Sequence, residues 1–66
     1  MRYRLREIRE EKRITQEKLE EMSGISRQTI SAIENNEGYQ AKVGTLMALA
    51  NALGTTVDNL FFEKAV

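Results

Sequence analysis

Two short amphipathic segments separated by only three residues constrain this chain more than any other feature. Residues 16–35 read QEKLEEMSGISRQTISAIEN, and apolar residues recur three positions apart in each half, the spacing of one helix face and not of a strand. These apolar residues are Leu19, Met22, Ile30 and Ile33. Gly24 tolerates the left-handed conformation that ends a helix sharply. The segment therefore predicts a helix at Gln16–Ser23, a tight turn, and a second helix that ends near Asn35.

The rest of the chain also has the pattern of short helices, with no convincing period of two. Hydroxyl side chains that can cap helix N-termini stand at Thr15, Ser26 and Thr56, and Gly54 can end a helix. The expected helices are about Tyr3–Arg13, Gln16–Ser23, Ser26 (as cap) to Asn35, Val43–Leu53, and a short one after Thr56. The expected core residues are Leu5, Ile8, Leu19, Met22, Ile30, Ile33, Leu46, Met47, Leu49, Ala50, Leu53, Val57, Leu60 and Phe61. These elements predict an all-α fold, a compact five-helix bundle. The tail 62–66 is either a frayed end or a short edge strand.

Length and composition exclude several classes of protein. The chain has 66 residues, which allow one domain, 1–66, and no deep enzyme cleft. It has no Cys and no His, so the usual zinc ligands and the usual neutral-pH base are missing, and we expect no enzyme, no metal and no cofactor. No apolar run approaches the roughly 18 residues that span a membrane, and no secretory signal is evident, so we expect a cytoplasmic protein without a membrane partner. From this length we also expect no small-molecule effector domain.

The outward side of the helix that follows Ser26 is polar, short-chained and free of acidic residues. At about 100° per residue, Ile30 and Ile33 define the buried side of this helix. The opposite side presents Gln28, Ser31, Ala32 and Asn35, with Ser26 and Arg27 at its N-terminal end. Gln can bond both edge atoms of adenine, Arg those of guanine, and Ala can contact the methyl group of thymine. The pattern is that of a helix-turn-helix, whose second helix enters the DNA major groove.

Three stretches of the sequence resemble one known family: IREEKRITQEKL, SGISRQTISAIEN and TLMALANALGTTVDNLF. The chain resembles the phage-repressor and Cro-like helix-turn-helix regulators, the xenobiotic-response-element (XRE) family, from about Leu5 to Phe62. The resemblance implies a five-helix, lambda-repressor-like DNA-binding domain with its helix-turn-helix at 16–35. It also implies a transcriptional regulator, which we expect to be a repressor. Such a regulator binds a pseudo-palindromic operator in double-stranded DNA as a homodimer.

The resemblance also assigns roles to single positions. Gln16 matches the glutamine with which members contact a phosphate, and Asn35 lies where phosphate contacts are common. Positions between 27 and 32 are those that members place at or near the bases, and Ser26 can hold the DNA backbone at the helix N-terminus. The residues expected to contact DNA are Gln16, Ser26, Arg27, Gln28, Ser31, Ala32 and Asn35.

Arg9 and Glu34 match a buried ion pair found in several members. The spacing supports this pair independently, because Arg9 lies one turn after Leu5 and Glu34 lies one turn after Ile30, on sides that face inward. Desolvation offsets much of the attraction in such a pair, but removing one partner leaves a buried charge and is costly.

Two stretches depart from the family pattern. Glu20 stands where the family prefers a small residue, which predicts either slightly splayed helices or a Glu20 side chain that bends out to solvent. The loop NNEGYQAKVG lacks the basic residues and proline often seen there, so its candidates for phosphate contacts are Tyr39, Gln40 and Lys42.

The charge of the chain keeps a second function open. The formal net charge is zero, although residues 1–13 hold six basic and three acidic side chains. We interpret Arg2, Arg4 and Arg6 as a solvated end in preference to a phosphate-binding arm. The alternative function is a protein-interaction module, such as an antitoxin or adaptor built on the same fold.

Phe62 is an aromatic residue that has no expected place in the core. It follows Phe61 directly, and both rings cannot face inward on the same short helix. We therefore assign Phe62 and the tail to a homodimer interface, against the alternative of an unpacked end.

Overall fold

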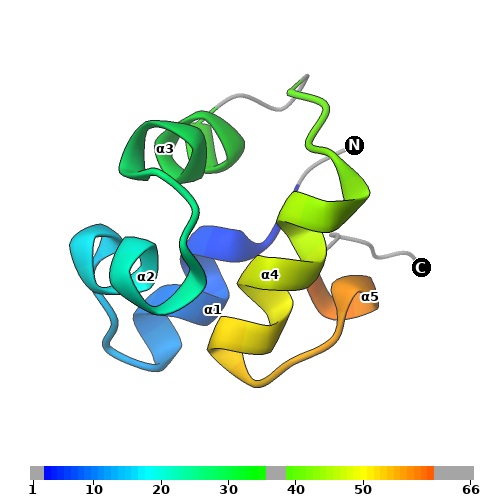
Figure 1. Ribbon diagram of the computed structural model, residues 1–66. Helices are drawn as coiled ribbons and strands as arrows, with labels where there is room; N and C mark the ends of the chain where they lie inside the picture. Colours follow the sequence, from blue (N-terminus) through cyan, green and yellow to red (C-terminus); the bar gives the residue numbers. More distant parts are fainter. Residues whose placement is uncertain (1–2, 36–38, 61–66) are drawn as a thin grey trace.

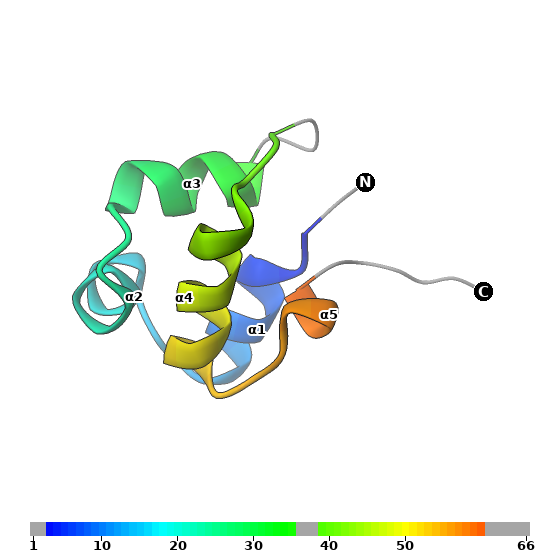
Figure 2. The same ribbon diagram turned by 45° about the vertical axis from the view of Figure 1, so that its right-hand side comes forward.

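The computed structural model describes residues 3–35 and 39–60, which form five α-helices (Figure 1). The helices are α1 (Leu5–Glu11), α2 (Gln16–Ser23), α3 (Arg27–Asn35), α4 (Val43–Leu53) and α5 (Val57–Leu60). α2 packs against α3 and α4, α1 contacts α3, and α5 packs on α4. Figures 1 and 2 both place α3 at the edge of the molecule, on the side far from α5. The expected all-α, five-helix fold is confirmed, and one long side of α3 faces outward.

The predicted helix ends have the expected chemistry. The hydroxyls of Thr15, Ser26 and Thr56 each accept a hydrogen bond from the backbone N–H three residues further on, at 3.0, 3.2 and 3.3 Å. Gly24 and Gly54 take the left-handed conformation after α2 and α4, with φ of 77° and 68°. These polar contacts satisfy backbone groups that a helix end leaves without a partner, so the short helices keep sharp boundaries.

Helix α1 is shorter than the predicted Tyr3–Arg13 at both ends. At its start, the backbone N–H of Arg4 donates to the carbonyl oxygen of Leu60 at 2.6 Å and joins the N-terminal segment to α5. At its end, Arg13 is left-handed with φ of 59°, and Arg13 and Ile14 donate back to the carbonyls of Glu10 and Arg9, both at 3.0 Å. This is a Schellman motif, which lets Ile14 pack against the core. Lys12 and Arg13 are good helix formers and favour a longer helix. The helix ends before them because the chain turns to bring Ile14 against the core.

We expect Arg13→Gly to stabilise the fold by about 1 kcal/mol. A side chain in the left-handed region costs about 1–2 kcal/mol, which glycine relieves. Part of this gain is lost because glycine raises the conformational entropy of the unfolded chain. Urea denaturation followed by circular dichroism measures the difference. The control is Lys12→Gly, one residue earlier, where φ is −92° and no strain is relieved. That variant should lose stability, and an equal gain in both would contradict the explanation.

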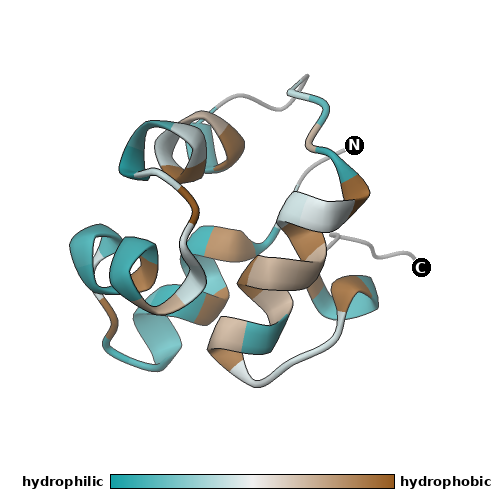
Figure 3. Cartoon of the chain, viewed as in Figure 1, coloured by the Kyte–Doolittle hydropathy of each residue, from teal (hydrophilic) through white to brown (hydrophobic). Residues whose placement is uncertain are grey.

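The core collects apolar residues from all five helices. Among the described residues ten apolar side chains are buried: Leu5, Ile8, Leu19, Ile30, Ile33, Leu46, Leu49, Ala50, Leu53 and Leu60. Burying a Leu or Ile side chain of this size contributes about 2 kcal/mol. Figure 3 shows the apolar residues gathered along α4 and on the inner sides of the helices around it. None of the described helices has the length and apolar character to cross a bilayer.

The prediction that Met22 and Met47 lie in the core is wrong. Met22 and Met47 are 43% and 52% exposed. Met47 lies about 100° around α4 from the buried Leu46, and Met22 lies about 60° around α2 from the buried Leu19, so the buried stripe of each helix is narrower than the apolar residues of the sequence suggest. Phe61 and the tail, including its possible edge strand, lie outside the described residues.

Candidate nucleic-acid interface

The outward side of α3 carries the predicted polar residues together. Ser26, Arg27, Gln28 and Asn35 are exposed, and Ser31 and Ala32 are half-buried. The opposite side holds Ile30 and Ile33, which are 0% and 2% exposed and anchor α3 in the core. In the described part of the chain nothing covers the outward side. α3 is therefore a firmly packed helix with one polar side open to solvent.

A buried ion pair joins α1 to the end of α3. Arg9 Nε lies 2.7 Å from Glu34 Oε2, and Arg9 Nη2 donates to Glu34 Oε1 at 3.1 Å. The Glu34 side chain is completely buried, and that of Arg9 is 10% exposed. The remaining Arg9 donor, Nη1, bonds the carbonyl oxygen of Ile14 at 2.8 Å. The pair expected from the sequence is thus present, in the two-point geometry that planar guanidinium and carboxylate groups favour.

The protonation state of Arg9 follows from this contact. The hydrogen bond that Arg9 donates to Glu34 raises the pKa of the Arg9 guanidinium above its ordinary value, and the charges of Glu34 and Glu10 act in the same direction. Burial acts in the opposite direction without cancelling the effect. Arg9 is therefore charged wherever the protein is folded, and Glu34 is its counter-charge.

Glu34 also fixes the side chain of Gln16. Gln16 Nε2 donates to Glu34 Oε1 at 3.0 Å, and Gln16 is half-buried at the first position of α2. An amide nitrogen has two protons, so one is left for a partner outside the molecule. The buried carboxylate of Glu34 thereby holds Gln16, a residue predicted to contact a DNA phosphate, beside α3. The sequence did not reveal this bond, because Gln16 and Glu34 lie 18 residues apart.

Arg27 has a partner that the sequence analysis missed. Arg27 Nη1 lies 2.8 Å from Glu17 Oε2, which joins the first residue of α3 to the first turn of α2. Both side chains are more than half exposed, at 56% and 68%. An exposed pair of this kind contributes about 0–1 kcal/mol, so a ligand can displace it.

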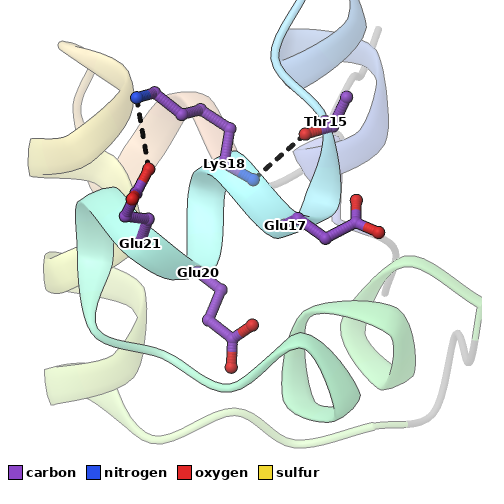
Figure 4. Close-up of a pocket in the computed structure, with 5 residues that line it drawn as sticks. All are labelled: Thr15, Glu17, Lys18, Glu20 and Glu21. Atoms are coloured by element: carbon purple, nitrogen blue, oxygen red, sulfur yellow. Dashed lines mark hydrogen bonds and ion pairs between the residues drawn. The ribbon is translucent and has the colours of Figure 1, made fainter.

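The position of Glu20 on α2 decides between the two alternatives that the sequence left open, splayed helices or a side chain that bends out to solvent. Glu20 is exposed, and its side chain extends away from α2, as Glu17 does (Figure 4). α2 and α3 pack on each other with Glu20 exposed, so the alternative in which its side chain bends out to solvent holds. On the same helix Lys18 is paired with Glu21 at 3.2 Å (Figure 4). Glu17, Glu20 and Glu21, with Thr15 and Lys18, line a shallow hollow.

The segment before α4 holds the loop candidates for phosphate contacts. Tyr39 is half-buried and packs against the core. Gln40 and Lys42 are exposed. Lys42 makes no ion pair with a described residue, so its ammonium group is available to an anion. Residues 36–38 of this loop and Phe62 lie outside the described residues.

Comparisons with known proteins agree with this geometry. A helix-turn-helix family model matches residues 5–60. The structure is similar to that of the restriction-modification controller protein C.AhdI from Aeromonas hydrophila, with a TM-score of 0.80 and 33% sequence identity; the alignment covers 88% of this chain and 86% of that one. No curated protein sequence matches the chain. The chain belongs to the XRE-type helix-turn-helix family of DNA-binding transcription regulators.

Proposed function

We propose that this protein represses transcription by binding a pseudo-palindromic operator as a homodimer, with α3 of each copy in the major groove. The observation that carries the proposal is the open polar side of α3 on a helix whose other side is locked in the core. Two such helices related by a two-fold axis reach successive major grooves about 34 Å apart. The sequence of the operator half-site would follow from the side chains on this open surface.

Gln28 is the residue best suited to read a base. Its side chain is exposed and makes no hydrogen bond to any described residue. Both the oxygen and the nitrogen of its amide are therefore available, which is what two-point recognition of adenine requires. Ser31 and Ala32 lie on the same side of the helix and can contact the neighbouring base pairs.

Phosphate contacts supply most of the affinity in such complexes, and base contacts supply the choice of sequence. The candidates for phosphate contacts are Gln16, Ser26, Arg27, Asn35, Gln40 and Lys42. Because few of these are charged, and Arg27 must first leave Glu17, we expect modest affinity for arbitrary DNA. Affinity should fall as salt is added, with a slope that counts the phosphates contacted by cations.

Selection of bound duplexes from a random pool, with the purified protein, tests the proposal. The expected result is a two-fold symmetric consensus whose half-sites are centred about 10 base pairs, or a multiple of that, apart. C.AhdI is a restriction-modification controller, so promoters of such systems are suitable natural templates for a transcription assay, in which the protein should lower transcript yield. Failure to enrich any sequence, together with tight capture of one protein partner, would instead support an interaction module.

Glu17→Gln should strengthen DNA binding about 3- to 10-fold at low salt, because it frees Arg27 and removes a negative charge beside the phosphates. The salt slope should become steeper by about one unit if Arg27 gains a phosphate. Fluorescence anisotropy with labelled operator at several salt concentrations measures both. Glu21→Gln removes the same charge one turn further along α2 and leaves Arg27 paired, so a gain as large in this control would contradict the explanation.

The homodimer is tested by sedimentation. We expect Phe62→Ala to shift the protein from dimer to monomer in analytical ultracentrifugation, because a large aromatic side chain can anchor an interface. Operator affinity should fall in parallel, since a monomer holds only one half-site. A variant that sediments as an unchanged dimer would remove Phe62 from the interface.

A further inference from the structure

A chain of three side chains runs from α1 to the middle of the outward side of α3. Arg6 Nη2 donates to Asn35 Oδ1 at 3.3 Å, and Arg6 Nε lies 3.7 Å from the buried Glu34. Asn35 Nδ2 in turn donates to Ser31 Oγ at 3.0 Å. Arg6 is 29 residues away from Asn35 in the sequence, and its side chain is 55% exposed. The N-terminal helix thus contacts the proposed DNA-reading surface through a defined set of bonds.

The direction of these bonds is fixed by Arg6. A guanidinium group has only donors, so the Asn35 atom that faces it must be the carbonyl oxygen. The Asn35 amide nitrogen must then face Ser31, whose oxygen accepts. Without a donor at Arg6, the Asn35 amide could turn over, and Ser31 would become the donor to Asn35.

Ser31 is therefore left with a free proton. Its oxygen accepts from Asn35, and its hydroxyl proton bonds to no described residue, whereas the hydroxyl of Ser23 on α2 donates to the carbonyl oxygen of Leu19 at 2.7 Å. In this state the Ser31 hydroxyl can donate its proton and keeps one lone pair, whereas in the turned-over arrangement its proton is used by Asn35 and it can only accept. In the major groove the free proton matches guanine O6 or N7, adenine N7 or thymine O4, whereas the turned-over arrangement would match only the amino groups of cytosine or adenine.

We propose that Arg6 is a specificity-positioning residue, which sets the orientation of Asn35 and so leaves the Ser31 proton free to donate a hydrogen bond to an acceptor-bearing base. The inference rests on the proposed function, since it concerns a base pair in the operator. Asn35 acts in it as a bridge, and the second proton of its amide is still available to a phosphate. Arg6 then contributes to the choice of DNA sequence, and is not simply part of a solvated N-terminal end.

Selection from the random pool, repeated with variants, tests the inference. Ser31→Ala identifies the base-pair position that Ser31 reads, where the wild-type preference should be about five-fold, as for one hydrogen bond. Arg6→Gln, which can either donate or accept, should lower this preference to less than about two-fold and leave the position read by Gln28 unchanged. Arg6→Lys, a pure donor, should retain it. The double variant Arg6→Gln/Ser31→Ala should lose no more than Ser31→Ala alone.

Arg4→Gln is the matched control. It removes the same charge from the same segment, but Arg4 is paired with Glu7 of α1 at 3.1 Å and makes no hydrogen bond or ion pair with a described residue of α3. It should leave the Ser31 position unchanged. An Arg6→Gln protein that keeps the full preference, or that loses affinity equally for all sequences, would overturn the inference.

A measurement without DNA separates this inference from the proposed function. In the free protein, the side-chain amide signals of Asn35 in ¹⁵N NMR spectra should move in Arg6→Gln and stay in place in Arg4→Gln. Unmoved signals overturn the positioning role even if the wild type selects an operator. If the wild type selects no DNA, the proposed function fails, and the base-selecting role of Ser31 fails with it, whatever the NMR spectra show.

Discussion

Replacing Glu34 by leucine is expected to unfold most of the protein at room temperature. The substitution leaves the buried guanidinium of Arg9 without its counter-charge and removes the acceptor of Gln16. Breaking a buried pair by deleting one partner costs about 3–5 kcal/mol. A domain of this size has a total stability of the same order. Circular dichroism during urea and thermal denaturation would show a lost or strongly shifted transition.

Two further variants separate the charge from the packing. Arg9→Met/Glu34→Leu replaces both members by apolar groups, and it should be at least about 2 kcal/mol more stable than Glu34→Leu, because no unpaired charge is buried. Arg4→Met breaks the exposed pair with Glu7 and should change the free energy of unfolding by less than about 1 kcal/mol. If Glu34→Leu unfolds no more easily than Arg4→Met, the buried pair does not have the structural role assigned to it.

Gln28→Ala is expected to abolish base preference at one position of each operator half-site. Loss of a two-point contact removes about 1–3 kcal/mol of discrimination at that position. Affinity for DNA without the operator should change little, because an uncharged residue at a base edge contributes little to non-specific binding. Competition between the consensus operator and duplexes changed at single positions measures the effect.

Gln16→Ala provides the contrasting case. We expect this substitution to weaken binding to all sequences by a similar factor, since Gln16 is assigned to a phosphate and not to a base. It should also lower stability somewhat, because Gln16 bonds the buried Glu34. Uniform and equal losses in the Gln28 and Gln16 variants would contradict both assignments.

Local chemistry explains why much of the fold could be predicted. The hydroxyl caps at Thr15, Ser26 and Thr56 and the glycines at 24 and 54 act within one turn of the chain. Such contacts are short-range, so they leave a recognisable pattern in the sequence. The bounds of α2 and α4 and the outward side of α3 followed from them and from the 3.6-residue period. The Arg9–Glu34 pair followed from the resemblance and from the inward sides of two helices.

The errors arose where one helix meets another. The sequence could not show that Ile14 would turn the chain at Arg13, or that Met22 and Met47 would lie beyond the edge of the core. Their exposure depends on how closely neighbouring helices approach, which propensity and period do not specify.

The sequence by itself determined the five helices, the ends of α2, α3 and α4, and the polar residues on the open side of α3. Only the tertiary structure decided how those residues are held: Gln16 by Glu34, Arg27 by Glu17, and Asn35 by Arg6. Helix formation depends on groups within about four residues, whereas these hydrogen bonds join side chains 10–29 residues apart. Such side chains become neighbours only after the helices have packed.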